Sequence, residues 1–184
     1  MTRREVKMAG FGGQGIILAG YILGKAAAVF ENRNAVQTQS YGPEARGGAC
    51  SADIVIDDDA IDYPLTSKVD VFVAMSEDAY RTHNDCMTAN GVLIIDEELV
   101  RLNERHGKRK VFRIPATKMA IDLGKRVVTN IVMLGFVTAV TDLVGFEAMK
   151  KAVLDSIPKG TEELNLKAFE SGYQYGLKAR TRTE

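Results

Sequence analysis

The amino-acid sequence predicts a single α/β domain in three layers, with a mostly parallel but mixed sheet and a helical C-terminal third. Over residues 1–115, apolar segments of strand length alternate with segments of helical pattern, an order typical of a sheet covered by helices. Residues 116–184 carry helical patterns alone. The length of 184 residues, without an internal repeat or a linker, matches one domain over 1–184.

The first unit is a strand, a glycine-rich turn and a helix. Glu5 to Ala9 predicts a short strand, and residues 16–30 (IILAGYILGKAAAVF) predict a helix that is apolar nearly all round. A helix of this kind is buried on more than one side. Gly20 and Gly24 share one face of it, and each costs about 1 kcal/mol relative to alanine in a helix. We therefore expect this face to approach the sheet or another helix closely.

Two strands with a glycine-rich loop between them follow. Residues 34–40 (NAVQTQS) and 49–56 (ACSADIVI) alternate between apolar and polar side chains, as half-buried strands do. The intervening loop, residues 41–48 (YGPEARGG), is too short to hold a crossover helix. The two strands are therefore either antiparallel neighbours or splayed apart, and an antiparallel pair makes the sheet mixed.

The rest of the sheet is predicted to be buried. Residues 69–75 and 91–96 are apolar enough for central strands, and residues 110–115 form a strand that ends at a proline. A helix begins after Ser76, which is suited to cap it. Four helical segments then complete the chain: ATKMAIDLG, which Gly124 ends, TNIVMLGFVTAVTDLVG, FEAMKKAVLDSIP and EELNLKAFESGYQYGLKAR.

The second of these helices, like the helix over 16–30, is almost entirely apolar. A domain of this size can cover one such helix, but covering 16–30 and 131–141 together is harder. We therefore expect the isolated chain to expose an apolar patch larger than a few hundred Å², which binds other chains.

Composition excludes several classes of function. The formal net charge is zero, so nothing draws the chain to nucleic acid or to an anionic membrane. The longest mostly apolar run, residues 131–140, is about half of what spans a bilayer. No apolar stretch of signal-peptide length precedes Gly10, which predicts a cytoplasmic protein. Cys50 and Cys86 match no metal spacing and predict buried, reduced thiols, and two cysteines cannot supply the roughly four ligands of a cubane iron–sulfur cluster.

Residues 10–15 (GFGGQG) have the spacing of a Rossmann-type dinucleotide motif. Glycines at this spacing let the backbone approach phosphates at a helix N-terminus. The motif also needs an acidic residue at the end of the second strand, but that strand ends Thr38, Gln39, Ser40. No P-loop lysine follows, which argues against nucleotide hydrolysis. The turn therefore either packs the helix on the sheet or serves a phosphate or a partner chain.

Several segments taken together carry a resemblance. GFGGQGIILAGYILGKAAA, QTQSYGPEARGG, SADIVI, IDYP and VDVFVAMSEDAY, followed by IPATKMAIDLG, VTNIVMLG and NLKAF, resemble the gamma subunits of 2-oxoacid:ferredoxin oxidoreductases from Val6 to about Gly176. The form QTQSYGPEARGG is most similar to 2-oxoglutarate enzymes, with pyruvate and branched-chain types close. The small subunit of indolepyruvate oxidoreductases shares the domain type and is one alternative. A stand-alone NAD(P)-binding Rossmann oxidoreductase is the other.

The resemblance implies a complex that oxidatively decarboxylates a 2-oxoacid to an acyl-CoA and passes the electrons to ferredoxin. It implies thiamine diphosphate, magnesium, iron–sulfur clusters and CoA, with thiamine-binding alpha and beta subunits, a ferredoxin-like delta subunit and external ferredoxin as partners. This chain has no G-D-G motif followed by asparagine for thiamine diphosphate and metal. We therefore expect it to carry no catalytic residue, to bind no cofactor alone and to be inactive in isolation, with a structural role on the CoA side.

The resemblance and the glycine loops together give a set of candidate residues for a CoA phosphate or a subunit interface. Arg46 is suited to pair with a phosphate or a carboxylate, and Tyr41 to stack on a ring or fill a partner's pocket. Asn130 either caps its helix or bonds to the glycine loop. We expect the two loops to meet at one edge of the sheet. The set is Gly12, Gly13, Gln14, Gly15, Ser40, Tyr41, Arg46, Gly47, Gly48 and Asn130.

Overall fold

The computed structural model of the chain describes residues 3–42, 48–102 and 109–181. These residues form a six-stranded sheet in the order β2-β3-β1-β4-β5-β6. β3 runs antiparallel to both of its neighbours, whereas β1, β4, β5 and β6 pair in parallel, so the predicted mixed sheet is confirmed. The strands are β1 (Arg4–Phe11), β2 (Asn34–Tyr41), β3 (Ala49–Asp57), β4 (Val69–Ala74), β5 (Met87–Asp96) and β6 (Lys110–Ile114).

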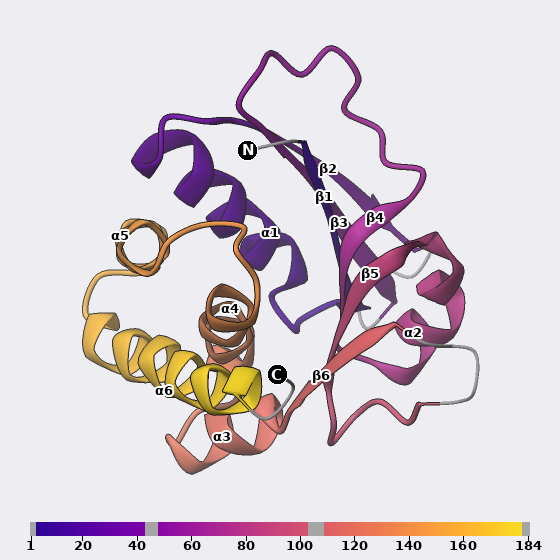
Figure 1. Ribbon diagram of the computed structural model, residues 1–184. Coiled ribbons are helices and arrows are strands. Elements are labelled where there is room, and N and C mark those ends of the chain that lie inside the picture. The colour runs from indigo at the N-terminus through magenta and orange to yellow at the C-terminus, as the bar shows by residue number, and fades with distance from the viewer. Residues whose placement is uncertain (1–2, 43–47, 103–108, 182–184) are drawn as a thin grey trace.

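Helices cover both faces of this sheet, which gives the three predicted layers. Figure 1 shows α2 on one side and α1, α3, α4, α5 and α6 together on the other. The helices are α1 (Ile16–Lys25), α2 (Glu77–His83), α3 (Ala116–Asp122), α4 (Thr129–Val140), α5 (Phe146–Leu154) and α6 (Glu162–Thr181). A π-helical turn, η1 (Ala26–Phe30), extends α1, and two 3₁₀ turns are η2 (Asn84–Cys86) and η4 (Arg126–Val128).

Local signals in the sequence explain where several elements begin. The Ser76 hydroxyl oxygen accepts a hydrogen bond from the Ala79 N–H at 3.2 Å, which confirms Ser76 as the cap of α2. Pro115 ends β6 and directly precedes α3. Gly124 follows α3 with a φ of +95°, a backbone conformation that favours glycine.

The sheet separates two apolar cores of different size. The larger lies under α1 and the C-terminal helices, and the smaller lies between the sheet and α2. All twelve residues of α4 are buried, because α6, α3, α5 and α1 surround it. α4 therefore adds almost nothing to the exposed apolar patch that the sequence predicts, and the patch itself stays a prediction. Among the exposed apolar side chains of the described residues, Leu18 and Tyr21 lie on α1 and Val29 on η1.

The two glycines of α1 have different surroundings. A Cβ added to Gly20 would lie 2.8 Å from the Ala52 Cβ on β3, so α1 approaches the sheet closely at this point, as predicted. A Cβ on Gly24 would meet Ala35 and Ile54 at 3.9 Å, an ordinary contact. The expected close approach is therefore confirmed at Gly20 and wrong at Gly24.

Candidate functional site

The glycine loop over residues 10–15 lies where the sheet changes its direction of winding. β1 and β4 are parallel neighbours, but α1 follows β1 on the face of the larger core and α2 follows β4 on the other face. Open α/β sheets bind ligands in the crevice outside the carboxyl ends of two such strands. The loop that joins β1 to α1 lies at this end of the sheet (Figure 1).

The loop adopts a shape that its glycines permit. Gly13 and Gly15 have φ angles of +96° and +74°, in the left-handed region that side chains disfavour. Gly15 is the residue before α1 and makes no side-chain cap, and Gly12 and Gly13 are exposed. The first amides of a helix have no acceptor within the helix and carry a partial positive charge. This end of α1 is therefore suited to an anion.

Gln14 is turned away from this exposed surface. Its side-chain oxygen accepts from the Phe11 N–H and its side-chain nitrogen donates to the Met75 carbonyl, both at 2.7 Å. The side chain therefore bridges the crevice from the end of β1 to the residue after β4. A Cβ on Gly10 would collide with the Gln14 side chain, which explains the first glycine of the motif.

Asn130 also bonds to the loop. Its side-chain nitrogen donates to the Gly15 carbonyl at 3.3 Å, and its side-chain oxygen accepts from the Ile131 N–H at 3.0 Å. α4 begins at Thr129, so Asn130 lies inside the first turn and is not the cap residue. Of the two arrangements that the sequence left open, the bond to the glycine loop is the one formed. A Cβ on Gly15 would collide with the Asn130 amide.

The second glycine-rich loop meets the first, as predicted. The Gly12 N–H donates to the Gly48 carbonyl at 2.9 Å. Ser40 and Tyr41, at the end of β2, are exposed, and the Tyr41 hydroxyl donates to the Gln39 side-chain oxygen at 2.8 Å. Arg46 and Gly47 lie outside the described residues.

Two hollows flank Gly13. One, of about 280 Å³, has largely apolar walls that include Leu18, Val127 and Ile157, with Lys125 at its border. The other, of about 200 Å³, is bordered by Arg126 together with Gln14, Thr117 and Thr129. The candidate residues predicted from the sequence do not include Lys125 or Arg126. Two adjacent basic residues just before the helix that carries Asn130 could have indicated them.

The strand arrangement departs from that of a dinucleotide-binding domain. In that fold the second strand lies directly beside the first, and its acidic end residue holds the ribose. Here β3 stands between β2 and β1, so the end of β2 lies two strands away from the glycine loop. The end of β2 therefore has no acidic residue, and it does not lie directly beside the glycine loop.

Asp96, at the carboxyl end of β5, supports the wall of the second hollow. One of its carboxyl oxygens accepts from the Thr117 N–H at 2.9 Å and from the Thr117 hydroxyl at 2.6 Å. The other accepts from the Glu98 N–H at 3.1 Å. The side chain is fully buried, and this burial raises the pKa of its carboxyl group despite these hydrogen bonds. Asp96 thus fixes the first turn of α3 beside Gly13 and Gln14.

Comparison with known proteins places the chain in a family. Residues 5–175 match the family described as pyruvate ferredoxin/flavodoxin oxidoreductase. The chain belongs to this family. The 2-oxoglutarate synthase subunit KorC of Methanocaldococcus jannaschii is 51% identical over 94% of this chain and 93% of its own. KorC of Methanothermobacter thermautotrophicus is 49% identical over 93% and 94%, respectively.

More distant members of this oxidoreductase family include a pyruvate-type subunit and a solved gamma subunit. The pyruvate synthase subunit PorC of M. jannaschii is 30% identical over 95% of this chain and 97% of its own. The gamma subunit of a keto/oxoacid ferredoxin oxidoreductase from Geobacter sulfurreducens is 38% identical. Its structure superposes with a TM-score of 0.85 over 96% of this chain and 99% of that chain. The predicted resemblance and fold class are thus confirmed.

The described residues bring together few side chains that bind metal ions. Among the described residues, no group of three or more histidine, cysteine, aspartate or glutamate side chains could hold a metal ion. Cys50 is a buried free thiol, as predicted, whereas Cys86 is only half-buried, so the predicted burial is wrong for Cys86. Burial raises the pKa of both thiols.

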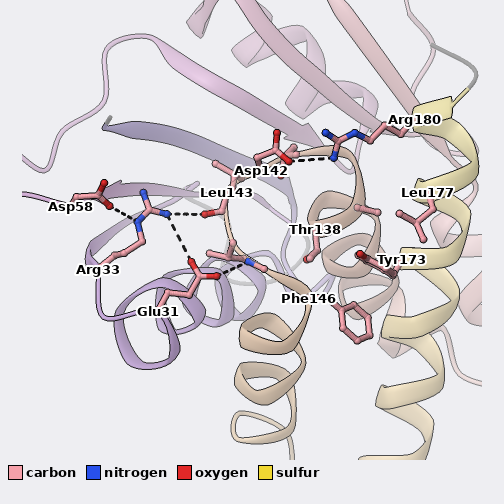
Figure 2. A pocket seen from close by; sticks show the side chains of 14 residues that line it. Glu31, Arg33, Asp58, Thr138, Asp142, Leu143, Phe146, Tyr173, Leu177 and Arg180 are labelled. Carbon is pink, nitrogen blue, oxygen red and sulfur yellow. Dashed lines mark hydrogen bonds and ion pairs between the residues drawn. The ribbon is translucent and has the colours of Figure 1, made fainter. Parts of the chain in front are cut away.

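A larger groove, of about 610 Å³, lies at the opposite end of the sheet, near the start of β2 (Figure 2). Figure 2 shows Arg33 between Asp58, Glu31 and the Leu143 carbonyl. The guanidinium lies 2.8 Å from the Asp58 carboxylate and donates to the Leu143 carbonyl, also at 2.8 Å. Glu31 in turn accepts from the Gly145 N–H at 2.6 Å. These interactions join the chain around Arg33 to the turns at Asp58 and Leu143, which indicates a structural role for the groove. We call Arg33 and its partners Glu31, Asp58 and Leu143 the clamp.

None of the helices in the described ranges is long and apolar enough to cross a membrane.

Proposed function

We propose that this chain is the gamma subunit of a 2-oxoglutarate:ferredoxin oxidoreductase. The assembled enzyme would oxidatively decarboxylate 2-oxoglutarate to an acyl-CoA and pass the electrons to ferredoxin. This proposal rests on the similarity to two KorC subunits. Each is about half identical to this chain over more than nine-tenths of both chains. Identity to the pyruvate-type PorC subunit is much lower, which favours 2-oxoglutarate as the substrate.

The proposed partners are thiamine-binding alpha and beta subunits, a ferredoxin-like delta subunit and external ferredoxin. Thiamine diphosphate, magnesium and the clusters would reside on these chains and supply the decarboxylation and electron transfer. The donor set of this chain supports this division, because it offers two cysteines where a cubane cluster needs about four. The residues of this chain would then position CoA and hold the neighbouring subunits.

The glycine loop is the proposed contact with CoA. A phosphate group of CoA would lie at the N-terminus of α1, where Gly13 leaves the backbone exposed. Lys125 and Arg126 border the hollows on either side of Gly13 and would attract the same charge. The apolar wall at Leu18 would suit the less polar arm of CoA. The other candidate residues would hold this contact in place. They are Gly12, Gly15, Gly48 and Asn130, together with Ser40, Tyr41, Arg46 and Gly47.

Coexpression tests the subunit assignment. The chain should copurify with a thiamine-binding subunit and a ferredoxin-like subunit. It should be colourless and inactive by itself, and the complex should oxidise 2-oxoglutarate only when CoA and ferredoxin are supplied. Turnover by the isolated chain, or a complex that prefers pyruvate, would contradict the proposal.

Two substitutions of one residue test the CoA contact. Gly13→Asp and Gly13→Asn add side chains of nearly equal size, and both residues tolerate a positive φ. An Asp carboxylate would repel the CoA phosphate, whereas the Asn amide would not. In the reconstituted complex we expect the KM for CoA to be about tenfold higher for Gly13→Asp than for Gly13→Asn, or about 1.4 kcal/mol. The KM for 2-oxoglutarate should be the same in both variants. Equal KM values for CoA would show that no phosphate lies at this loop.

A further inference from the structure

β2 forms one edge of the sheet and lacks the features that protect most edges. Edge strands expose unpaired N–H and C=O groups, and proteins limit this with short strands, charges or proline. The opposite edge, β6, has five residues and carries Lys110 and Arg113. β2 has eight residues, NAVQTQSY, with no charged side chain and no proline. In the described part of the chain it pairs with β3 alone.

The side chains of β2 alternate between the two faces of the sheet. Gln37 points toward α1, because its side-chain nitrogen donates to the Ile17 carbonyl at 3.0 Å. Ala35, Gln39 and Tyr41 share this face by their spacing of two, whereas Thr38 lies on the other. Tyr41 is 65% exposed.

An apolar hollow lies between α1 and this free edge. Its volume is about 300 Å³, and Ala35 and Gln37 of β2 form one side. Tyr21 and Val29 are on the other side and are 50% and 63% exposed. The unpaired edge is therefore continuous with an exposed apolar stripe.

A second copy of β2 fits this edge in charge and in register. An uncharged strand can face itself without repulsion, whereas a copy of β6 would bring cations against cations. Directly opposed residues of an antiparallel pair point to the same face. If Thr38 faces Thr38 of the other copy, α1 of both copies lies on one side. Tyr41 of each copy then faces Ala35 of the other, at the border of the hollow.

The spacing of the helices supports the same arrangement. α1 lies over β3, since Gly20 approaches Ala52. The two α1 helices of a pair would be three strand spacings apart, or about 14 Å. Helices in direct contact are about 8–10 Å apart. Side chains must therefore fill the difference, and Tyr21, Val29 and the inserted Tyr41 are the exposed side chains at this position.

We propose that two copies of this chain pair through β2, antiparallel about a two-fold axis at Thr38. The pair extends the sheet across both copies, and each Tyr41 enters the hollow beside α1 of the other. This interface concerns the isolated chain and does not depend on the proposed enzymatic role.

The mass of the purified full-length chain in solution is the first test. Light scattering during size exclusion should give about 40 kDa, twice the chain mass of 20.1 kDa. Tyr41→Ser should weaken the dimer at least about tenfold, since it removes a buried ring worth more than 1.4 kcal/mol. Tyr63→Ser is the matched control, because Tyr63 is 64% exposed and its carbonyl accepts from Arg3, next to β1, which β3 separates from β2. The dimer of this variant should be unchanged. A wild-type monomer at all accessible concentrations, or equal effects of the two substitutions, would overturn the proposal.

A disulfide tests the register. Thr38→Cys should give a covalent dimer under mild oxidation, because the Cα atoms of directly opposed residues lie about 4.5–5.5 Å apart in such a pair, within the Cα range that a disulfide spans. Ser40→Cys, on the same face but opposite Val36, should not. The wild-type chain, with Cys50 and Cys86, gives the background. Covalent dimers of Ser40→Cys but not of Thr38→Cys would contradict the register even if a dimer exists. Circular dichroism of each variant confirms folding, and the wild-type mass tests the proposal if a variant fails to fold.

Discussion

The side chain of Gln14 makes two hydrogen bonds across the crevice, to the Phe11 N–H and the Met75 carbonyl. Gln14→Glu keeps the acceptor but replaces the donor with an oxygen that faces the carbonyl. Such a loss costs about 1–3 kcal/mol, more than the 0.3–1 kcal/mol gained by a carboxylate near a helix N-terminus. We therefore expect a lower free energy of unfolding, measured by urea denaturation.

Gln174→Glu is the matched control for this change. Gln174 is exposed on α6, so its substitution should alter stability by less than about 0.5 kcal/mol. If the two variants are equally stable, Gln14 does not brace the loop.

The sequence indicated the glycine loop and Asn130 as candidates, but it could not supply their hydrogen-bond partners. The role of Gln14 depends on Met75, which reaches it only because β4 pairs with β1 in parallel. Lys125 lies near Gly13 because the chain just before α4 packs beside the glycine loop. These contacts join residues more than sixty positions apart, and no local pattern encodes them.

At the scale of elements, the two glycines of α1 should respond oppositely to alanine. Gly24→Ala should stabilise the chain by up to about 1 kcal/mol, because helix propensity improves and the new methyl group makes ordinary contacts. Gly20→Ala should destabilise it by about 1–3 kcal/mol, because its methyl group would press on Ala52. Thermal unfolding of both variants checks this, and a stabilising Gly20→Ala would show that α1 can move from the sheet.

The clamp at Arg33 should also contribute to stability. Arg33 joins the chain after η1 to the Asp58 turn and the Leu143 turn, and its side chain is 9% exposed. Arg33→Met keeps most of the stem but loses these bonds, and its partners Asp58 and Glu31 can still be partly solvated. We expect a loss of about 2 kcal/mol in the free energy of unfolding.

Lys167→Met serves as the comparison for this clamp. Lys167 pairs with Glu163 one turn away on α6, and both side chains are mostly exposed. Its loss should cost less than about 0.5 kcal/mol. Similar losses for the two variants would mean that Arg33 contributes no more than a surface pair.

The elements themselves were largely predictable, because their hydrophobic periods are long and clear. Each predicted strand and helix exists, although the helix predicted over 129–145 ends at Val140 and the strand predicted over 91–96 already begins at Met87. The position of β3 between β2 and β1 was not predictable, because a short loop implies an antiparallel pair but not its neighbours. The complete burial of α4 was not predictable either, because it needs four other helices around it. The burial of a helix on all sides depends on tertiary packing, which a local sequence pattern does not encode.

At the scale of the whole molecule, one histidine links stability to pH. His83 is half-buried at the end of α2, with its ring edge-on to Phe72 at 6.2 Å between centroids. Burial lowers the pKa of His83, the positive charge of Lys7 lowers it further, and Asp53 partly offsets both. The folded chain therefore binds a proton at His83 less readily than the unfolded chain, whose histidine has the ordinary pKa of 6.5.

The sign of the pH effect follows from this difference. Below about pH 6.5 the unfolded chain takes up more protons than the folded chain, so the free energy of unfolding falls as the pH falls. His83→Gln removes this titration, and its stability should depend less on pH between about 5.5 and 7. The buried carboxyl of Asp96 acts with the opposite sign but titrates from a lower ordinary pKa of 3.8, and it is present in both proteins. Urea denaturation of wild type and variant across this pH range isolates His83 as the difference, and parallel curves would show that its pKa is the same in both states.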